Sequence, residues 1–169
     1  MKNSLRIFFL ILITSLFSGC EKDDICAAGT PTTPRLVIEF YSIDNSTVRK
    51  LVANLKVQGE GAATTLDFNQ VDTIELPLKT NENFTNYSLN INSTSGTASN
   101  NTDFIRFNYS VNDIYISRAC GFKSRFNLNL ANGIIQTNPE GDTDFWIKNI
   151  EIVKSNVETE EDVHIKMYF

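Results

Sequence analysis

Apolar and polar residues alternate along most of the chain after residue 35, and this alternation predicts short β-strands with one buried face. Leu36, Ile38 and Phe40 form the first apolar set. Further sets are Leu51, Ala53, Leu55 and Val57; Ile74, Leu76 and Leu78; Tyr87, Leu89 and Ile91; Ile105, Phe107, Tyr109 and Val111; Phe122, Phe126, Leu128 and Leu130; Trp146, Ile150 and Ile152; Val163, Ile165, Met167 and Phe169. A period of two is typical of half-buried strands in antiparallel sheets.

The alternating sets are separated by residues that favour tight turns, such as Asn132-Gly133 and the segment 138–141. About eight short strands over residues 35–169 suit two packed sheets. We therefore predict an all-β fold, an antiparallel two-sheet β-sandwich of Ig-like or jelly-roll-like type.

The first twenty residues carry a different pattern, that of an export signal. Lys2 and Arg6 precede an apolar run over Ile7–Phe17, and Ser18-Gly19-Cys20 follows. A helix of that run rises about 16 Å, roughly half the hydrocarbon core of a bilayer, so a signal peptide is favoured over a membrane span. Phe17-Ser18-Gly19-Cys20 resembles a bacterial lipobox, with Phe17 in place of the usual Leu. The alternative is a plain secretory signal followed by a chance Cys.

This interpretation divides the chain into three parts. Residues 1–19 are a lipoprotein signal peptide, residues 20–34 are a lipidated tether and extended lead-in, and residues 35–169 are the β-sandwich domain. Acyl chains on Cys20 would hold the protein on a membrane, since each buried CH₂ contributes about 0.8 kcal/mol. Lys22, Asp23 and Asp24 directly behind Cys20 resemble the export signal of Bacteroidota surface lipoproteins; a solvated acidic tether is the alternative. We expect an outer-membrane location, with the outward face favoured over the periplasm.

Two cysteines remain once Cys20 is acylated. Cys26 and Cys120 are an even number in an oxidising compartment, where disulfides form and persist. Their bridge would close a loop worth about 4.5 kcal/mol in the chain-entropy model. Because Cys26 lies six residues beyond Cys20, the tether spans at most about 20 Å. Two free buried thiols are the alternative to the bridge.

Several segments resemble a flavobacterial (Bacteroidota) lipoprotein family, a domain of unknown function. They are residues 20–26, 30–38 and 76–80, and Ser117-Arg118-Ala119-Cys120-Gly121-Phe122-Lys123. The resemblance covers most of the mature chain and is most specific around the two cysteines. It implies the lipid anchor and a structural Cys26–Cys120 pair, and it implies no activity.

Charge and composition exclude several classes of function. The net charge of −5 argues against a nucleic-acid partner, which requires a basic surface. Removing residues 1–19 takes away two of the 15 basic residues and none of the 20 acidic ones, which leaves −7. A single His and three Cys exclude a zinc finger and most multi-His metal sites. No cofactor is implied.

Candidate catalytic groups are few. His164, the single His, alternates with Val163, Ile165 and Met167, which predicts a solvent-facing strand residue rather than a catalytic one. Paired carboxylates could hydrolyse glycosides without a His. Glu39, Glu75 and Glu151 lie on predicted outward faces, and Asp103, Asp113 and Asp144 at strand edges, but nothing in the pattern selects a pair. Acids on outward strand faces usually serve solubility.

Three other features carry weaker predictions. Glu140, Asp142 and Asp144 are hard-oxygen Ca²⁺ ligand candidates in a short loop that ordinary turn chemistry also explains. Thr73 in Asp72-Thr73-Ile74 resembles an O-glycosylation acceptor of Bacteroidota. Trp146 beside Phe145 could stack on sugars, but a core Trp is favoured.

These observations predict a non-enzymatic envelope lipoprotein that is held to the membrane by its N-terminal lipid and acts as an interaction or accessory subunit, with an outer-membrane protein as partner. A glycan-binding module is the alternative, and a carboxylate-based hydrolase the third candidate. An interaction subunit should expose an apolar or edge-strand patch. A glycan binder should expose Trp146 or a line of tyrosines. A hydrolase should hold two carboxylates in one cleft. The oligomeric state is left open.

Overall fold

The computed structural model describes residues 25–93, 100–139 and 144–169. The described residues form eleven β-strands and contain no α-helix: β1 (Leu36–Tyr41), β2 (Leu55–Gly59), β3 (Leu66–Phe68), β4 (Thr73–Leu76), β5 (Phe84–Ile91), β6 (Asn101–Ser117), β7 (Gly121–Leu128), β8 (Ile134–Thr137), β9 (Asn149–Ile152), β10 (Asn156–Val157) and β11 (Ile165–Tyr168). None of the described residues forms a helix long and apolar enough to cross a membrane. The predicted all-β class is confirmed.

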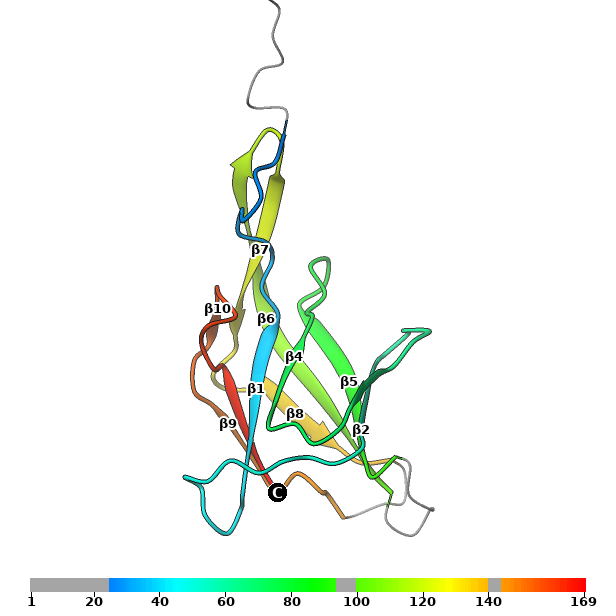
Figure 1. Ribbon diagram of the computed structural model, residues 1–169. Helices are drawn as coiled ribbons and strands as arrows, with labels where there is room; N and C mark the ends of the chain where they lie inside the picture. The colour runs from blue at the N-terminus through cyan, green and yellow to red at the C-terminus, as the bar shows by residue number, and fades with distance from the viewer. Residues whose placement is uncertain (1–24, 94–99, 140–143) are drawn as a thin grey trace, which may run out of the picture. The chain divides into compact units, whose positions relative to one another are not determined.

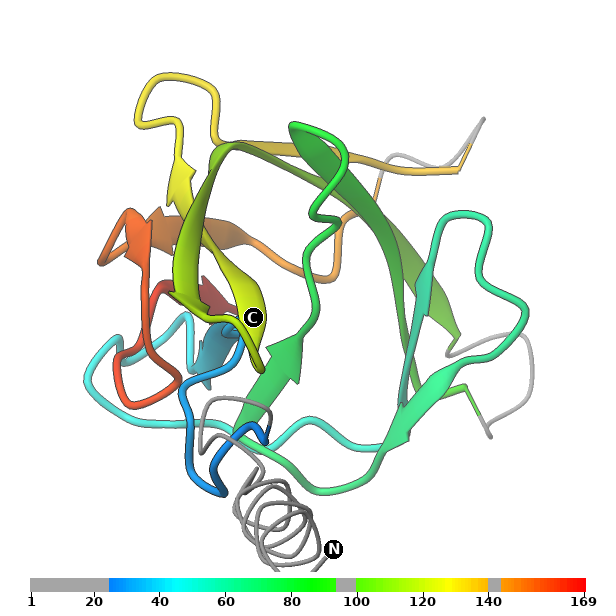
Figure 2. The ribbon, with the colours of Figure 1, turned by 90° about the horizontal axis from the view of Figure 1, so that it is seen from above.

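The strands form two sheets (Figures 1 and 2). The smaller sheet has the order β4-β1-β11-β9, and the larger has the order β10-β7-β6-β5-β2-β3 with β8 paired to β6. The predicted two-sheet sandwich is thus confirmed, with more strands than the eight expected. One pair differs from the antiparallel expectation: β1 and β11 run parallel, with Ile38 opposite Ile165. A parallel pair joins strands far apart in the sequence, so local alternation carries no sign of it.

Both sheets contribute to one hydrophobic core. Leu36, Ile38 and Phe40 of β1 face Leu89 and Phe107 of the larger sheet within one cluster of buried side chains. These residues belong to the predicted alternating sets. Three members of those sets are exposed instead: Leu51 precedes β2, Phe122 lies near the start of β7, and Leu130 follows β7. Their exposed fractions are 55%, 68% and 77%. The alternation of apolar and polar residues in the sequence extends beyond the ends of the strands, so it does not mark where a strand begins or ends.

The backbone divides into two compact units. Unit 1 contains residues 1–31 and 115–122, and unit 2 contains residues 32–114 and 123–169. Within unit 1, Cys26 and Cys120 form a disulfide bond with a Cα–Cα distance of 4.9 Å, and the predicted bridge is confirmed. The Thr30 hydroxyl donates to Ala27 O at 2.7 Å, and Cys120 N donates to Ser117 Oγ at 3.0 Å. These bonds organise a small unit that has little core of its own.

Candidate functional site

The outer face of the larger sheet carries a groove across four neighbouring strands. The strands β8, β6, β5 and β2 lie side by side (Figure 1), and the groove encloses about 590 Å³. Strand register places the outward side chains that line it in two rows, Thr137-Phe104-Ser88-Gln58 and Ile135-Arg106-Asn86-Glu60. Alternate residues of a strand point to the same face, so the register brings together residues that are up to 79 positions apart in the sequence. We call this feature the outer-sheet groove.

Three members of the second row, Arg106, Asn86 and Glu60, form a chain of paired polar side chains. Arg106 Nε donates to Asn86 Oδ1 at 2.8 Å, and Asn86 Nδ2 donates to a carboxylate oxygen of Glu60. The Arg106 guanidinium also lies over the Phe84 ring, 4.7 Å from its centroid. The carboxamide therefore links a cation to an anion, and the row carries no net charge. Held in this way, the row offers both donors and acceptors at fixed positions.

The opposite end of the groove is apolar. Phe104 and Ile135 are 41% and 42% exposed and come from two paired strands. Phe104 points outward because its neighbours on β6, Ile105 and Phe107, are buried in the core. An exposed apolar pair beside ordered polar groups is typical of a contact surface.

A second hollow lies on the same unit and is lined by amides. It encloses about 410 Å³ and is lined by Asn83, Asn108, Tyr109, Ser110, Asn127, Asn129 and Asn132. Some of these carboxamides are already engaged: Asn108 Nδ2 donates to Asn132 O at 2.7 Å, and Asn127 Nδ2 donates to Asn156 Oδ1 at 2.6 Å. Asn83 is exposed. We call this feature the asparagine hollow.

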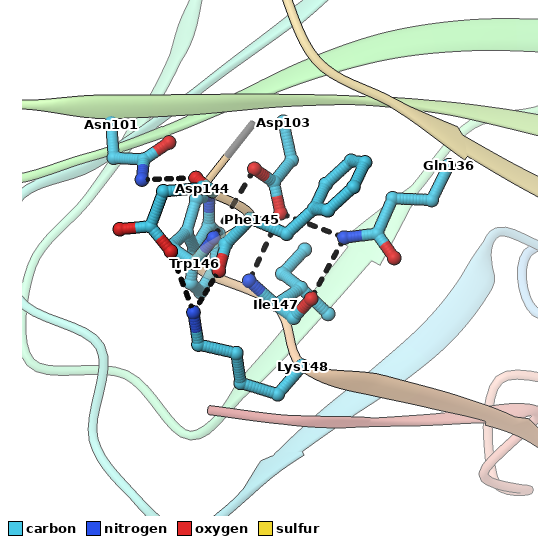
Figure 3. A network of polar contacts seen from close by, with 8 residues as sticks. All are labelled: Asn101, Asp103, Gln136, Asp144, Phe145, Trp146, Ile147 and Lys148. Carbon is cyan, nitrogen blue, oxygen red and sulfur yellow. Dashed lines mark hydrogen bonds and ion pairs between the residues drawn. The ribbon is translucent and has the colours of Figure 1, made fainter. Parts of the chain in front are cut away.

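Asp103 is a buried acid that sequence reasoning had placed at a strand edge. Its carboxylate accepts hydrogen bonds from Trp146 N at 3.3 Å, Ile147 N at 2.9 Å and Gln136 Nε2 at 2.9 Å (Figure 3). Gln136 Nε2 also donates to Ile147 O at 2.8 Å. Burial raises the pKa of the Asp103 carboxyl, while the hydrogen bonds from Ile147, Gln136 and Trp146 oppose that rise. These contacts fasten the backbone of residues 146–147 to β6 and β8.

Trp146 is held in the core by the same network. Its side chain is 7% exposed, and Nε1 donates to Leu89 O at 2.9 Å. The ring packs edge-on against Phe169 at 5.5 Å. The predicted core Trp is confirmed, and a sugar-stacking role for Trp146 is excluded because its faces are covered. Four of the five tyrosines are buried and Tyr115 is exposed, so no line of surface tyrosines exists either.

The expectation for His164 was wrong. The side chain is fully buried and lies directly before β11 rather than on a solvent-facing strand position. Val37 N donates to its Nδ1 at 3.0 Å, and burial lowers the pKa of the imidazole. No partner of Nε2 occurs among the described residues. The β1–β11 pairing begins at Ile38 and Ile165, one residue later. At Val37, the acceptor for the backbone N–H is therefore the His164 ring rather than a backbone carbonyl.

The expectation for Glu39 was also wrong. Its side chain is 3% exposed, since β1 is a central strand covered on both faces. Its carboxylate accepts from the Tyr41 hydroxyl at 2.8 Å and pairs with Arg49. Glu75 pairs with Arg35, and Glu151 accepts from the Tyr168 hydroxyl at 2.9 Å. Asp113 accepts from Ser124 Oγ at 2.6 Å. No two of these acids line the outer-sheet groove, where Glu60 is the single carboxylate of the described lining.

The remaining predicted sites are placed as follows. Cys20, Lys22, Asp23, Asp24, Glu140 and Asp142 lie outside the described residues. Asp144 is exposed and its carboxylate pairs with Lys148 Nζ at 2.9 Å. Across the described part of the chain, no group of three or more His, Cys, Asp or Glu could hold a metal ion. Thr73 lies in β4, and its hydroxyl donates to Asp72 Oδ1 at 3.0 Å.

Sequence reasoning missed both hollows. The lining residues are ordinary polar and apolar strand positions that no motif marks, and only cross-strand register brings them together. A signal was present in the outward positions of two strands, because Phe104 and Ile135 are apolar where alternation expects polar residues.

Comparisons with known proteins identify a family for most of the chain. A family model described as a family of unknown function, DUF6452, matches residues 54–169. The matched span contains β2 to β11, and with them every residue that lines the two hollows. No curated protein and no solved structure matches the chain. The family description assigns neither an activity nor a membrane anchor.

Proposed function

We propose that this chain, which belongs to the family of unknown function DUF6452, is a lipid-anchored envelope protein that binds a protein partner through the outer-sheet groove. The observation that carries the proposal is the exposed apolar pair Phe104 and Ile135 beside a fixed polar row. Interaction surfaces combine an apolar centre with satisfied polar groups around it. The protein acts by binding, without catalysis.

The anchor in this proposal is Cys20. Its support is the charged start, the short apolar run and the small residues before Cys20, together with the Cys26–Cys120 bridge that suits an oxidising compartment. The location that follows is the outer membrane, facing outward rather than into the periplasm. The tether residues Lys22, Asp23 and Asp24 support export.

The partner proposed for the groove is an extended segment of an outer-membrane protein that presents an apolar side chain among polar groups. The apolar end of the groove takes the side chain, and the row Arg106-Asn86-Glu60 supplies donors and acceptors for the segment beside it. Because that row is internally neutralised, it favours a partner segment without strong net charge.

Replacing Cys20 with Ala tests the anchor. We expect the wild-type protein in the outer-membrane fraction and the Cys20→Ala protein outside it. Intact mass of the purified wild-type protein should show the added acyl chains. A Cys20→Ala protein that stays in the membrane fraction, together with a wild-type protein that carries no acyl mass, would contradict lipid anchoring through Cys20.

Photo-crosslinking from Thr137 tests the groove. Thr137 is exposed and lines the groove, so a photoreactive residue there reports its occupant in intact envelopes. We expect a crosslink to an outer-membrane protein that is lost in Phe104→Ser. The matched control is Leu66→Ser, because Leu66 on β3 is also 41% exposed and does not line the groove. Equal crosslinking by both variants would refute the groove as the binding surface.

Glycan binding is the second candidate, and the asparagine hollow favours it. Carboxamides offer both a donor and an acceptor to sugar hydroxyls. Titration calorimetry with envelope polysaccharide fragments tests this candidate, with Asn83→Ala as the variant because Asn83 is exposed at the rim. If Asn83→Ala loses the heat of binding while Phe104→Ser retains it, the binding site is the asparagine hollow rather than the outer-sheet groove.

The hydrolase candidate has less support than either binding role. A glycosidase of the usual type needs two carboxylates flanking the scissile bond. Glu60 is the single carboxylate among the described groove residues, and the asparagine hollow has none. Neither hollow therefore offers a pair for acid–base catalysis.

A further inference from the structure

We propose that unit 1 is a foot that inserts apolar side chains into the surface of the lipid bilayer. The foot is defined by its described residues, 25–31 and 115–122. This inference rests on the lipid anchor of the proposed function and adds a second membrane contact to it. Its occupant is the lipid surface itself rather than a protein.

The foot exposes three large apolar side chains. Ile25 is 77% exposed, Phe122 68% and Tyr115 55%. The Tyr115 and Phe122 rings meet edge to face with centroids 5.3 Å apart, so they form one ordered aromatic cluster. An aromatic pair that packs on itself while it stays open to solvent needs an explanation, because unit 1 has no core to which these rings contribute. Tyr and other amphipathic rings are enriched at membrane–water interfaces.

The foot also differs in charge from the rest of the protein. Its described residues contain Arg118 and no Asp or Glu, whereas the whole chain has a net charge of −5. Arg118 is exposed. Glu21, Asp23 and Asp24 belong to the tether, whereas residues 25–31 and 115–122 present one cation beside exposed rings. Basic side chains are attracted to an anionic lipid surface. The acids of unit 2 would be unfavourable there.

The position of the anchor places the foot at the membrane. Cys26 lies six positions after Cys20 in the sequence, so a lipidated Cys20 keeps Cys26 within about 20 Å of the bilayer surface. The disulfide then holds Cys120 beside Cys26, with their Cα atoms 4.9 Å apart. One bridge thus holds both segments of the foot together, and Cys120 lies only two positions before Phe122. Gly121 takes a φ of 70°, which lets the chain turn between Cys120 and Phe122.

Depth-dependent quenching of fluorescence tests the foot. Full-length lipidated protein is reconstituted in phosphatidylethanolamine–phosphatidylglycerol vesicles with and without brominated acyl chains. The reporter is Phe122→Trp, and the matched control is Leu130→Trp, because Leu130 is comparably exposed at 77% on unit 2. Both variants retain the buried Trp146 as a constant internal reference. These exposed replacements avoid the core, so both proteins should fold.

We expect brominated lipid to quench the Phe122→Trp emission at least about twice as strongly as that of Leu130→Trp. Equal quenching, or none, in protein that floats with the vesicles overturns the foot and leaves the anchor standing. Protein that does not float, and whose mass shows no acyl chains, overturns the anchor and the foot together. A Phe122→Trp emission that is shielded only in envelopes, and never quenched in vesicles, identifies a protein contact and also overturns the foot.

Discussion

The outer faces of the two sheets differ in how they are covered. On the smaller sheet, the Glu39 side chain of β1 is buried. Its carboxylate pairs with Arg49 and accepts a hydrogen bond from the Tyr41 hydroxyl. Directly before β1, Arg35 pairs with Glu160 at 2.8 Å. On the larger sheet, Phe104 and Ile135 remain open beside the Arg106-Asn86-Glu60 row. One face is closed by its own side chains, and the other is left with a groove.

The difference teaches where to look for function in a β-sandwich without catalytic residues. On the smaller sheet, Glu39 pairs with Arg49 and Glu75 pairs with Arg35, so these charges are already satisfied within the protein. The larger sheet neutralises its charges in one row and leaves apolar area next to them. If this comparison is right, substitutions on the closed face change stability, and substitutions on the open face change binding.

Among substitutions of charged side chains, the largest expected loss of stability comes from Asp103→Ala, on the inner side of the open sheet. It leaves Trp146 N, Ile147 N and Gln136 Nε2 without their shared acceptor in a buried site. We expect a fall of about 3 kcal/mol in the free energy of unfolding, measured by chemical denaturation. Asp113→Ala on the same strand is the control, since Asp113 is exposed, and it should cost less than about 1 kcal/mol.

Glu39→Ala tests the closed face and should cost about 2 kcal/mol. The Tyr41 hydroxyl loses its acceptor, and Arg49 retains only Asp72 at 3.7 Å. Glu151→Ala is the matched control, because Glu151 also accepts from a tyrosine hydroxyl on this sheet but is exposed. Denaturation curves for the two variants that coincide would show that burial on the closed face contributes nothing.

The pair of Arg35 and Glu160 gives a smaller, pH-dependent effect. Hydrogen bonds from Arg35 lower the pKa of Glu160 from 4.5 to about 2. A lowered carboxyl pKa stabilises the fold above the unfolded pKa, and this contribution is lost as the pH falls from about 4.5 towards 2. The pair is partly exposed, so we expect about 0.5 kcal/mol.

Measuring unfolding of Glu160→Gln against pH checks this effect. The stability gap to the wild type should be constant near neutral pH and should close between pH 4.5 and 2. Glu161→Gln, one residue along at an exposed position, is the control for removing one carboxylate. A gap that widens in acid would reverse the assigned sign.

The smallest expected change in stability is that of Phe104→Ser on the open face, less than about 0.5 kcal/mol. Its ring is already 41% exposed, whereas the Phe107 ring on the same strand is fully buried. Phe107→Ser should therefore cost more than about 3 kcal/mol in the same measurement. A loss in Phe104→Ser that approaches that of Phe107→Ser would mean that the ring serves the fold rather than a partner.

Much of the fold could be predicted from the sequence, because burial of one strand face leaves a period of two. The inward residues Leu36, Ile38 and Phe40 were found in this way. The same rule misplaced Glu39 and His164, since it assumes that the opposite face meets water. β1 is covered on both faces and pairs with β11 in parallel, and neither fact leaves a local trace. The outer-sheet groove was missed for the same reason, because it depends on register across four strands.

The sequence by itself determined the strand faces, the export signal as a prediction and the number of cysteines available for a bridge. Those properties depend on local spacing and on residue chemistry, which a single chain records directly. Only the tertiary structure decided that Asp103 and His164 are buried, that Glu39 is paired on a covered sheet face, and that Phe104 and Ile135 line one groove from paired strands. Burial, pairing and hollows depend on which distant segments come together, and that is a property of the packed chain rather than of any segment.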